Sequence, residues 1–301
     1  MGWKIFFSFL FIFFAVLLLI LYWFVPLGDV VTFGVKSKNS NFSLNGDENM
    51  QFYSNMRFQD SEISYKIYNC PLKEENDMQY AFEIVSNKTL MKFYPVNLDE
   101  EISVTCDDSA KVEGGLFIAG EGGPTNITKT DNFNVIFNGK ILLLRESDCE
   151  RPNIAIHELF HVLGFKHSNN PYNIMYNITS CYQTIGEDNL KLLKDLYSVP
   201  SYADLSFEDA SASMHGRYLD TNISIRNNGL KKSEEAKIII YADGKKIKEI
   251  DLKFLEIGYG ITISLTNVFV NKFSVNGIKF EIASDFSELD KENNKITLSV
   301  G

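Results

Sequence analysis

Three of the four histidines in this 301-residue chain lie between His157 and His167, in the stretch HELFHVLGFKH. A helix places residues four apart on one face, so His157 and His161 would point the same way with Glu158 beside them. Gly164 can adopt a left-handed backbone, which ends a helix and turns the chain so that His167 returns toward the first two imidazoles. The spacing therefore predicts three imidazoles that face one point.

Three neutral imidazoles suit zinc, and a catalytic zinc site keeps a fourth position for water. Glu158 is placed to take a proton from that water. The alternative is a chance grouping of surface or core histidines. From average residue usage, three His, one Glu and one Gly at these offsets should arise by chance in roughly one chain of this length in a hundred thousand. The motif therefore indicates a zinc site.

The pattern HExxHxxGxxH resembles the zinc signature of the metzincin metallopeptidases, whose second mark is a methionine turn beneath the metal. Here that turn is Asn173-Ile-Met-Tyr176. Ser168 after the third histidine and a later helix ending at Tyr197 are most similar to the matrixin branch. The resemblance covers roughly residues 61–198. It implies an α+β zincin-like domain, with a small, mostly antiparallel-edged sheet and an active-site helix. It also implies these roles: His157, His161 and His167 as zinc ligands, Glu158 as the base, and Met175 in the methionine turn.

The resemblance also implies an edge strand above the cleft that pairs with extended substrate backbone. Leu116 to Gly120 is the candidate, with Leu116, Ala119 and Gly120 as substrate contacts and a flexible segment over residues 120–124. Tyr176 and Asn177, within residues 175–179, would wall the pocket for the side chain after the scissile bond.

Two features depart from the matrixin pattern. Matrixins commonly carry a second, structural zinc held by upstream histidines, and no histidine precedes His157. We therefore expect one zinc. The family's calcium loops are not recognisable, which leaves calcium uncertain.

Residues Ile5 to Val25 are apolar apart from Ser8 and the interfacial aromatic residues. This run has about the ~20 residues that span a bilayer as a helix. A cleaved secretory signal is the alternative, but the run is longer than a usual signal and no clear A-x-A site follows it. Lys4 precedes the run and Asp29 follows it, which predicts a cytoplasmic N-terminus. We expect a signal-anchor over residues 1–27, a polar stalk over residues 28–60, and the remainder extracytoplasmic at the cell membrane.

The four cysteines, Cys70, Cys106, Cys149 and Cys181, make an even set in a segment expected to face an oxidising exterior. Free buried thiols are the alternative. Of the three pairings, we favour Cys70 with Cys106 and Cys149 with Cys181, because the second pair would brace the zinc helix against the loop after the methionine turn. N-glycosylation sequons fit an external location; they begin at Asn41, Asn87, Asn126, Asn177 and Asn222. The net charge of −10, with no basic stripe, argues against nucleic-acid binding.

Local patterns predict the elements of a domain over residues 61–199. Apolar residues at helical spacing predict a helix over residues 72–86, and alternation predicts a strand over residues 102–106. Asn138-Gly139 predicts a hairpin that joins strands 133–137 and 141–144. A last helix is expected over residues 187–197.

Residues 200–301 carry recurring alternation that predicts an all-β antiparallel sandwich. Its expected strands cover residues 219–225, 236–241, 247–252, 261–265, 278–282 and 296–300. Turns at Asn227-Asn-Gly229 and Asp243-Gly244, together with the segment 288–294, resemble CARDB-type adhesion modules. We expect no metal role for His215, and we interpret the acidic run 288–292 as a solvated turn rather than a cation site.

Two functions fit these features. The first is a single-pass, outward-facing zinc endopeptidase that hydrolyses protein or peptide substrates. The second is a surface or adhesion protein with a structural zinc, whose C-terminal domain binds a surface partner. Glu158 favours the enzyme, because a structural site is closed by four ligands and has no use for a carboxylate at that offset.

Overall fold

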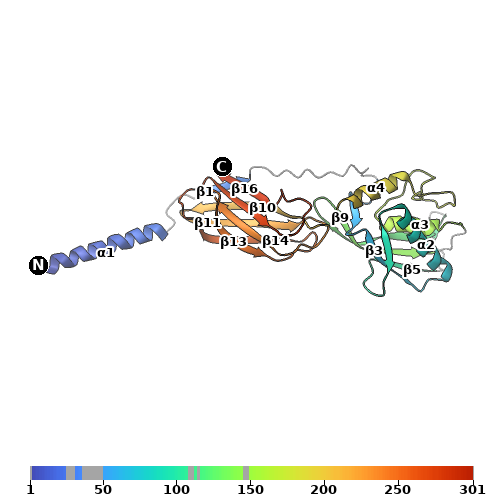
Figure 1. The fold of residues 1–301 in the computed structure, drawn as a ribbon, viewed down its shortest axis with the longest axis horizontal. Coiled ribbons are helices and arrows are strands. Elements are labelled where there is room, and N and C mark those ends of the chain that lie inside the picture. The colour runs from blue at the N-terminus through green and yellow to red at the C-terminus, as the bar shows by residue number, and fades with distance from the viewer. Residues whose placement is uncertain are drawn as a thin grey trace. The chain divides into compact units, whose positions relative to one another are not determined.

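The computed structural model describes residues 2–24, 31–35, 50–107, 112–113, 116–144 and 149–300. Contacts divide the chain into two compact units. The α/β unit comprises residues 41–203 and 228–231, and the β unit comprises residues 1–40, 204–227 and 232–301. Figure 1 shows the helices α2, α3 and α4 in the first and the strands β10 to β16 in the second.

The α/β unit is built on one sheet in the order β2-β9-β5-β3-β4, whose neighbours are all parallel. One further strand, β8, pairs with β9 antiparallel. Strand β8 pairs with β9 along residues 134–143. The other side of β9 is shared by β2, which pairs with residues 134–136, and β5, which pairs with residues 139–143. Strand β8 therefore lies at the edge of the sheet. The strands are β2 (Met56–Phe58), β3 (Glu62–Tyr68), β4 (Lys92–Pro95), β5 (Ile102–Cys106), β8 (Gly120–Lys129) and β9 (Asn134–Leu143).

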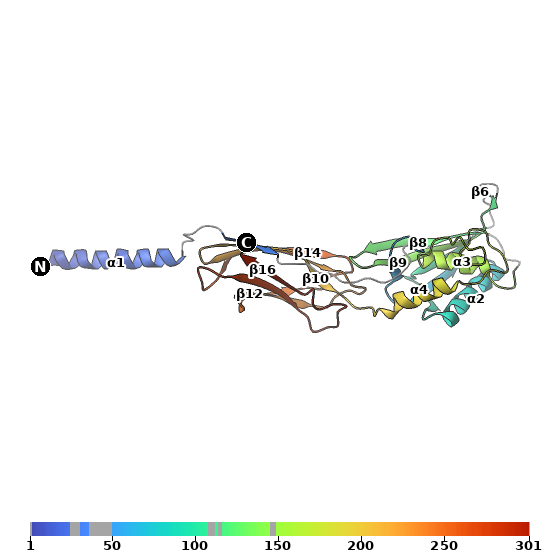
Figure 2. The same ribbon diagram turned by 90° about the horizontal axis from the view of Figure 1, so that it is seen from above.

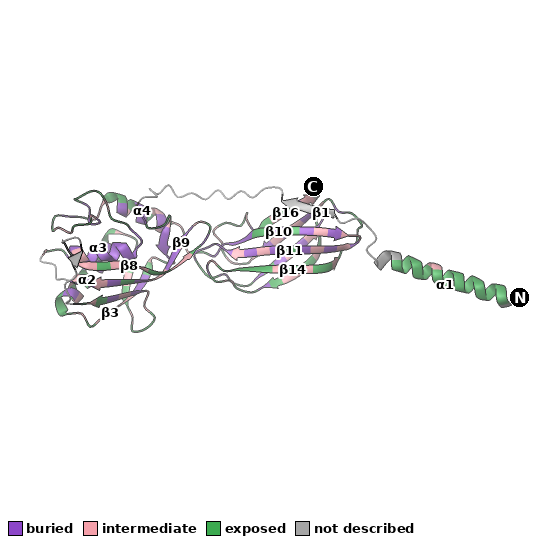
Figure 3. Ribbon diagram, turned by 180° about the vertical axis from the view of Figure 1, so that it is seen from behind, coloured by how far each residue is buried: buried purple, intermediate pink, exposed green. Residues whose placement is uncertain are grey.

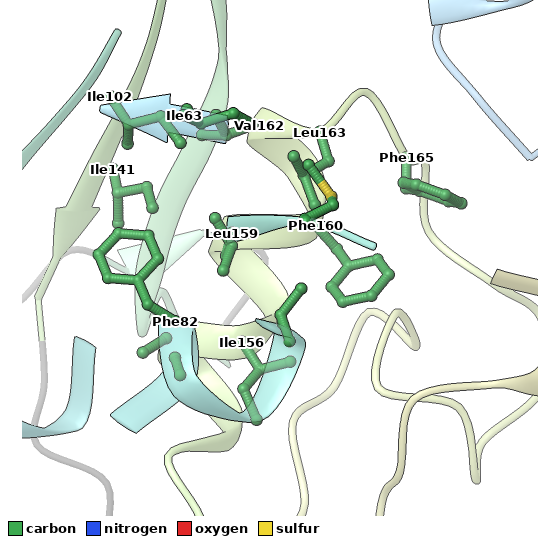
Figure 4. Packing of buried hydrophobic residues seen from close by; sticks show 14 of the residues in the cluster. Ile63, Phe82, Ile102, Ile141, Ile156, Leu159, Phe160, Val162, Leu163 and Phe165 are labelled. Atoms are coloured by element: carbon green, nitrogen blue, oxygen red, sulfur yellow. The ribbon is translucent and has the colours of Figure 1, made fainter. Parts of the chain in front are cut away.

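Three helices pack with this sheet, and all three were predicted. They are α2 (Leu72–Lys88), α3 (Asn153–Val162) and α4 (Glu187–Ser198). Figure 4 shows the apolar stripe of α3 beside Phe82 of α2 and the sheet residues Ile63, Ile102 and Ile141. That stripe consists of Ile156, Leu159 and Phe160, continued by Leu163 after the helix, and each of these side chains is buried. Burial of this stripe holds α3 against the sheet and thereby positions His157 and His161, which lie on the same helix.

The predicted hairpin at Asn138-Gly139 is wrong, because residues 134–143 form one continuous strand, β9. The Gly139 amide donates to the Glu101 carbonyl at 2.8 Å. A Cβ on Gly139 would lie 2.4 Å from Val162 Cγ1. The glycine therefore permits close approach of α3 to a strand interior and does not mark a turn.

The predicted edge strand at residues 116–120 is also wrong in its position. Leu116–Phe117 forms the short strand β7, which pairs with β6 (Val112–Glu113) away from the main sheet. The segment expected to be flexible, residues 120–124, instead begins the edge strand β8. Figure 2 shows β8 beside β9 and next to α3.

The β unit holds one antiparallel sheet in the order β13-β12-β15-β16-β1-β10-β11-β14. Burial alternates along β11 and β12, as Figure 3 shows for β11, and places one face of each of these strands in the core. All six strands predicted here are present, and β10 was missed. The strands are β1 (Val31–Val35), β10 (Leu205–His215), β11 (Tyr218–Asn227), β12 (Ala236–Ala242), β13 (Lys245–Leu252), β14 (Gly260–Phe269), β15 (Gly277–Ala283) and β16 (Lys295–Val300).

The predicted stalk over residues 28–60 needs correction at both ends. Strand β1 pairs with β10 on one side and β16 on the other, so it is an internal strand of the β unit. Strand β2 pairs with β9 in the α/β unit. Both pairings join segments far apart in the chain, which no local pattern could reveal.

The N-terminal helix α1 (Gly2–Phe24) contains a stretch, Trp3–Leu21, long and apolar enough to cross a membrane. Its side chains are exposed almost throughout (Figure 3). A signal sequence near an N-terminus has the same properties.

Both predicted disulfides are present, Cys70–Cys106 and Cys149–Cys181, and no cysteine is free. The first ties the end of β5 to the residues just before α2.

Candidate active site

The three histidines of the motif meet at one point in the α/β unit. His157 and His161 lie on α3, and His167 follows the loop after it. The Nε2 atom of His161 lies 3.0 Å from Nε2 of His157 and 3.1 Å from Nε2 of His167. Candidate ligand atoms of all three lie within 4.8 Å of one another. The geometry predicted from the spacing is therefore present.

The protonation of two imidazoles follows from their main-chain partners. His157 Nδ1 lies 2.7 Å from the Ile174 carbonyl oxygen, and His161 Nδ1 lies 2.8 Å from the Phe165 carbonyl oxygen. A carbonyl oxygen only accepts, so each Nδ1 carries a proton. Burial is the main cause that lowers the pKa of both residues to about 4, so both rings are neutral at pH 7. Their Nε2 atoms therefore carry lone pairs and no proton.

These residues fit a zinc ion. Two unprotonated Nε2 atoms 3.0 Å apart cannot hydrogen-bond to each other, and a cation between them removes their repulsion. Neutral imidazole is a preferred zinc ligand, and a second-shell carbonyl on the other ring nitrogen is its usual partner. Burial also lowers the pKa of the more exposed His167, which favours its neutral form.

Gly164 turns the chain between α3 and the third histidine. Its φ is +93°, as predicted, and its amide donates to the His161 carbonyl at 3.0 Å. A Cβ there would lie 2.6 Å from Met56 Sδ, so space as well as backbone conformation requires glycine. The next residue, Phe165, supplies the carbonyl that orients His161.

The methionine turn connects two of the histidines. The Ile174 carbonyl accepts from His157, and the Met175 carbonyl accepts from the Ser168 amide at 2.7 Å, directly after His167. Met175 itself is fully buried. Asn173 shapes this turn: its Oδ1 accepts from the Met175 amide at 2.9 Å, and its Nδ2 donates to Asn189 Oδ1 on α4 at 2.8 Å. The turn therefore holds both ends of the motif in place.

Glu158 lies on α3 next to His157, and only 5% of its surface is exposed. Burial, and then the carboxylate of Glu121 on β8, raise its pKa to about 8. Two glycines let β8 approach it closely. A Cβ on Gly120 would lie 2.7 Å from Glu158 Cγ, and one on Gly122 would lie 2.3 Å from the Glu158 carbonyl oxygen.

The residues expected to contact substrate lie at the start of β8, after the methionine turn and on β7. Ala119 directly precedes β8, its carbonyl accepts from the Leu144 amide at 3.0 Å, and Gly120 begins β8 against Glu158. Tyr176 and Asn177 follow the methionine turn, half-buried and exposed respectively. Leu116 lies on β7, and its side chain is outside the described residues.

Sequence patterns did not predict the contacts that three residues make around the triad. Phe52 stacks on His161 with ring centroids 5.9 Å apart, and its amide donates to the Gly164 carbonyl at 2.9 Å. It lies in a segment with weak periodicity, so no signal pointed to it. The sequence did hold a signal for Asn173, because an asparagine side chain in a turn often hydrogen-bonds to the backbone two residues further along. Nothing in the sequence around Gly122 indicated that this glycine lies against the main chain of Glu158.

The disulfide Cys149–Cys181 links the residues before α3 to the loop after the methionine turn, as the favoured pairing required. Asn153 reinforces the link, because its Nδ2 donates to the Ser180 carbonyl at 2.7 Å. His215 belongs to β10 in the β unit, where its Nδ1 is 3.6 Å from Asp220 Oδ2.

Comparison with known proteins agrees with these features. Residues 57–198 match the family model of matrixin, and residues 203–298 match that of CARDB. A macrophage metalloelastase from Rattus norvegicus is 26% identical over 161 residues, which cover 46% of this chain. The chain spans only 33% of that relative. A solved CARDB domain from Pyrococcus furiosus, in complex with di-metal ions, is 14% identical and covers 33% of this chain and 93% of its own, with a TM-score of 0.27.

Proposed function

Because the chain combines a matrixin-like metallopeptidase domain with a C-terminal CARDB domain, we propose that it is a zinc endopeptidase that cleaves protein or peptide substrates. The single observation that carries the proposal is the convergence of three Nε2 atoms, two of which are unprotonated because their Nδ1 protons go to carbonyls. His157, His161 and His167 would hold one zinc. When bound, zinc supplies a Lewis acid that polarises a carbonyl and lowers the pKa of water.

Glu158 is the general base in this proposal. Its buried carboxylate takes a proton from the attacking water, whose oxygen forms the new bond to the scissile carbonyl carbon. As the C–N bond breaks, the protonated Glu158 returns that proton to the leaving amine. Without a metal, a pKa of about 8 keeps Glu158 largely protonated at pH 7. A zinc ion held by the neighbouring histidines would favour the carboxylate form that a base needs, and burial would then favour uptake of the proton from water.

Substrate backbone would pair with β8. This strand uses one side for β9, and its start lies against Glu158. Pairing along an edge strand supplies affinity through main-chain hydrogen bonds. Ala119 and Gly120 would contact substrate near the reacting carbonyl, with Leu116 beyond them. Tyr176 and Asn177 would wall the pocket on the other side, and Met175 would lie beneath the metal.

The proposal is tested by Glu158→Ala in the purified protein. We expect zinc content and thermal midpoint to stay nearly unchanged while peptide hydrolysis falls by roughly 10²–10⁴-fold. His161→Ala should lose zinc, and Glu150→Ala, at an exposed position before α3, should leave hydrolysis unchanged. All forms are compared on one peptide at one pH and zinc concentration, because metal affinity depends on pH. If Glu158→Ala keeps its zinc and full activity, Glu158 is not the base. If no form cleaves a broad peptide library although all but His161→Ala hold zinc, the adhesion function replaces the enzyme.

We further propose that α1 anchors the protein in the cell membrane as a single pass, with both domains extracytoplasmic. The length of the apolar helix and two disulfides support this, since disulfides persist in oxidising compartments. Protease added to intact cells should remove the CARDB domain while an N-terminal fragment stays in the membrane fraction. A soluble protein that begins near Leu27 would identify a cleaved signal instead.

A further inference from the structure

A buried carboxylate at the start of β10 has only acidic side chains as charged neighbours within the described part of the chain. Asp204 lies in the β unit, just before β10, with 2% of its surface exposed. Its Oδ1 accepts from Asn293 Nδ2 at 2.9 Å. Burial raises the pKa of Asp204 to about 6, and the charged side chains acting on it, Glu288 and Asp290, are both acidic. The Asp290 amide and Asn293 Nδ2 both hydrogen-bond to Asp204, but both are neutral, so the buried carboxylate still calls for a positive charge.

Glu288 is held beside the same strand. Its Oε2 accepts from the Leu205 amide at 2.8 Å, and its Oε1 accepts from Asn294 Nδ2 at 2.9 Å and from the Ser284 hydroxyl. These bonds bring a second carboxylate to the residue that follows Asp204. Lys291, the lysine of the same loop, is exposed and donates to the Ser284 carbonyl at 3.4 Å.

The neighbouring asparagines leave oxygen atoms without partners. Each donates its Nδ2 to one of the two carboxylates, Asn293 to Asp204 and Asn294 to Glu288. The Oδ1 atoms of both are buried and have no hydrogen-bond partner. Asn294 is 2% exposed, so bulk water does not reach it. Buried acceptors are nearly always paired, so two orphan oxygens beside two carboxylates indicate a missing ligand.

We propose that Asp204, Glu288, Asn293 and Asn294 bind a divalent cation of the calcium class, which revises the interpretation of residues 288–292 as a solvated turn. A hard cation takes carboxylate and amide oxygens together, which are the donors gathered here. It would compensate the two carboxylates and pair the orphan oxygens in one step. Zinc is disfavoured because the donors include neither nitrogen nor sulfur. The site joins the start of β10 to the segment between β15 and β16, and it is independent of the proposed peptidase activity.

Calcium titration of the full chain, purified in detergent with its zinc retained, tests the proposal. Buffers are freed of calcium on a chelating resin, and zinc content is checked before and after. We expect calcium to bind with an affinity in the range of extracellular modules, roughly 10⁻⁴–10⁻³ M, and to raise the melting midpoint of the β unit. Asp204→Asn should lose one calcium equivalent. Asp285→Asn, an exposed carboxylate of the same loop, is the matched control and should lose none.

Asn294→Asp separates a cation site from a merely structural polar cluster. Without a cation, this change removes a donor to Glu288 and adds a buried carboxylate, so the melting midpoint should fall. With calcium, the added ligand should restore the midpoint and make its rise larger than in the unaltered protein. The proposal is overturned if the unaltered protein binds no calcium up to 10 mM (about ten times the weakest affinity expected). It is equally overturned if Asp204→Asn binds as many equivalents as Asp285→Asn, or if calcium does not restore Asn294→Asp.

Discussion

Each ring on α3 is oriented by a residue outside the helix. The Ile174 carbonyl fixes His157, and the Phe165 carbonyl fixes His161. Such outer partners set the tautomer and aim the free nitrogen, and losing one typically weakens metal binding by 10–100-fold. Because both partners are main-chain carbonyls, the orientation of the two rings depends on the backbone of these loops and not on the side chains of Ile174 and Phe165.

Gly120 offers a test at the residue scale of how closely β8 must approach Glu158, the proposed base. In Gly120→Ala, the new methyl group would lie 2.7 Å from Glu158 Cγ and 2.9 Å from its Oε1. Glu158 must then shift, and a misplacement of about 1 Å in a catalytic group can cost roughly 10²-fold in rate. We expect hydrolysis to fall by about that factor while zinc content stays at one per chain, measured on the same preparation.

Gly123→Ala is the matched control for that prediction. It lies on the same strand, and a Cβ there meets nothing within 4 Å. Its activity should match the unaltered protein. Equal activity in the two alanine variants would show that the approach of β8 to Glu158 does not limit the reaction.

At the scale of elements, glycines govern how α3 packs on the sheet. Gly139 on β9 admits Val162, and Gly122 on β8 admits the main chain of Glu158. The helix can therefore lie against two strands at once (Figure 2), with its apolar stripe in the core (Figure 4). The close contact between elements, and not any single side chain, places Glu158 beside the edge strand.

Asp204, at the start of β10, predicts that the free energy of unfolding of the β unit depends on pH. Asp204 has a folded pKa of about 6 against an ordinary value of 3.8, so the folded state binds the extra proton between these values. Stability is therefore highest below the unfolded pKa and falls as pH rises through about 6, by roughly 3 kcal/mol at most. In calcium-free buffer, Asp204→Asn should remove this loss and unfold at higher denaturant concentration than the unaltered protein at pH 7. Denaturant unfolding at pH 4 and pH 7 measures the difference. An identical pH dependence in both proteins would contradict the prediction.

At the scale of the whole chain, the α/β unit is inserted between two strands of the β unit. Strand β1 precedes it, β10 follows it, and the two pair directly. The N-terminal helix therefore leads first into the β unit. Two units that share one chain in this way still have separate cores, one for each.

Truncation tests the insertion. An ectodomain that begins at Leu27 retains β1, and one that begins at Lys36 lacks it. Loss of an internal strand leaves the facing groups of β10 and β16 unpaired, so the melting midpoint of the β unit should fall by at least about 10 °C. The α/β unit should keep its transition and its zinc. Calorimetry resolves the two transitions. Equal transitions in both proteins would mean that β10 and β16 close the gap unaided.

The sequence by itself determined the parts whose information is local. The spacing of His157, Glu158, His161, Gly164 and His167 predicted the triad, because a helical repeat and one glycine suffice to bring the three rings together. Helical and alternating patterns located three helices and most strands of the β unit. The cysteine pairing followed from the segments that a disulfide would usefully brace, and both bonds are present.

Only the tertiary structure decided what depends on distant segments. Asn138-Gly139 has the local chemistry of a hairpin, but packing against α3 and pairing with β5 and β8 hold it extended. The glycine-rich start of β8 is a strand because β9 supplies its partners. Strand β1 lies in a weakly periodic segment that left room for one strand, and its place in the sheet depends on β10 and β16, whose paired residues are more than 170 positions away. Side-chain periodicity records which face is buried, but not which distant segment will cover or pair with it.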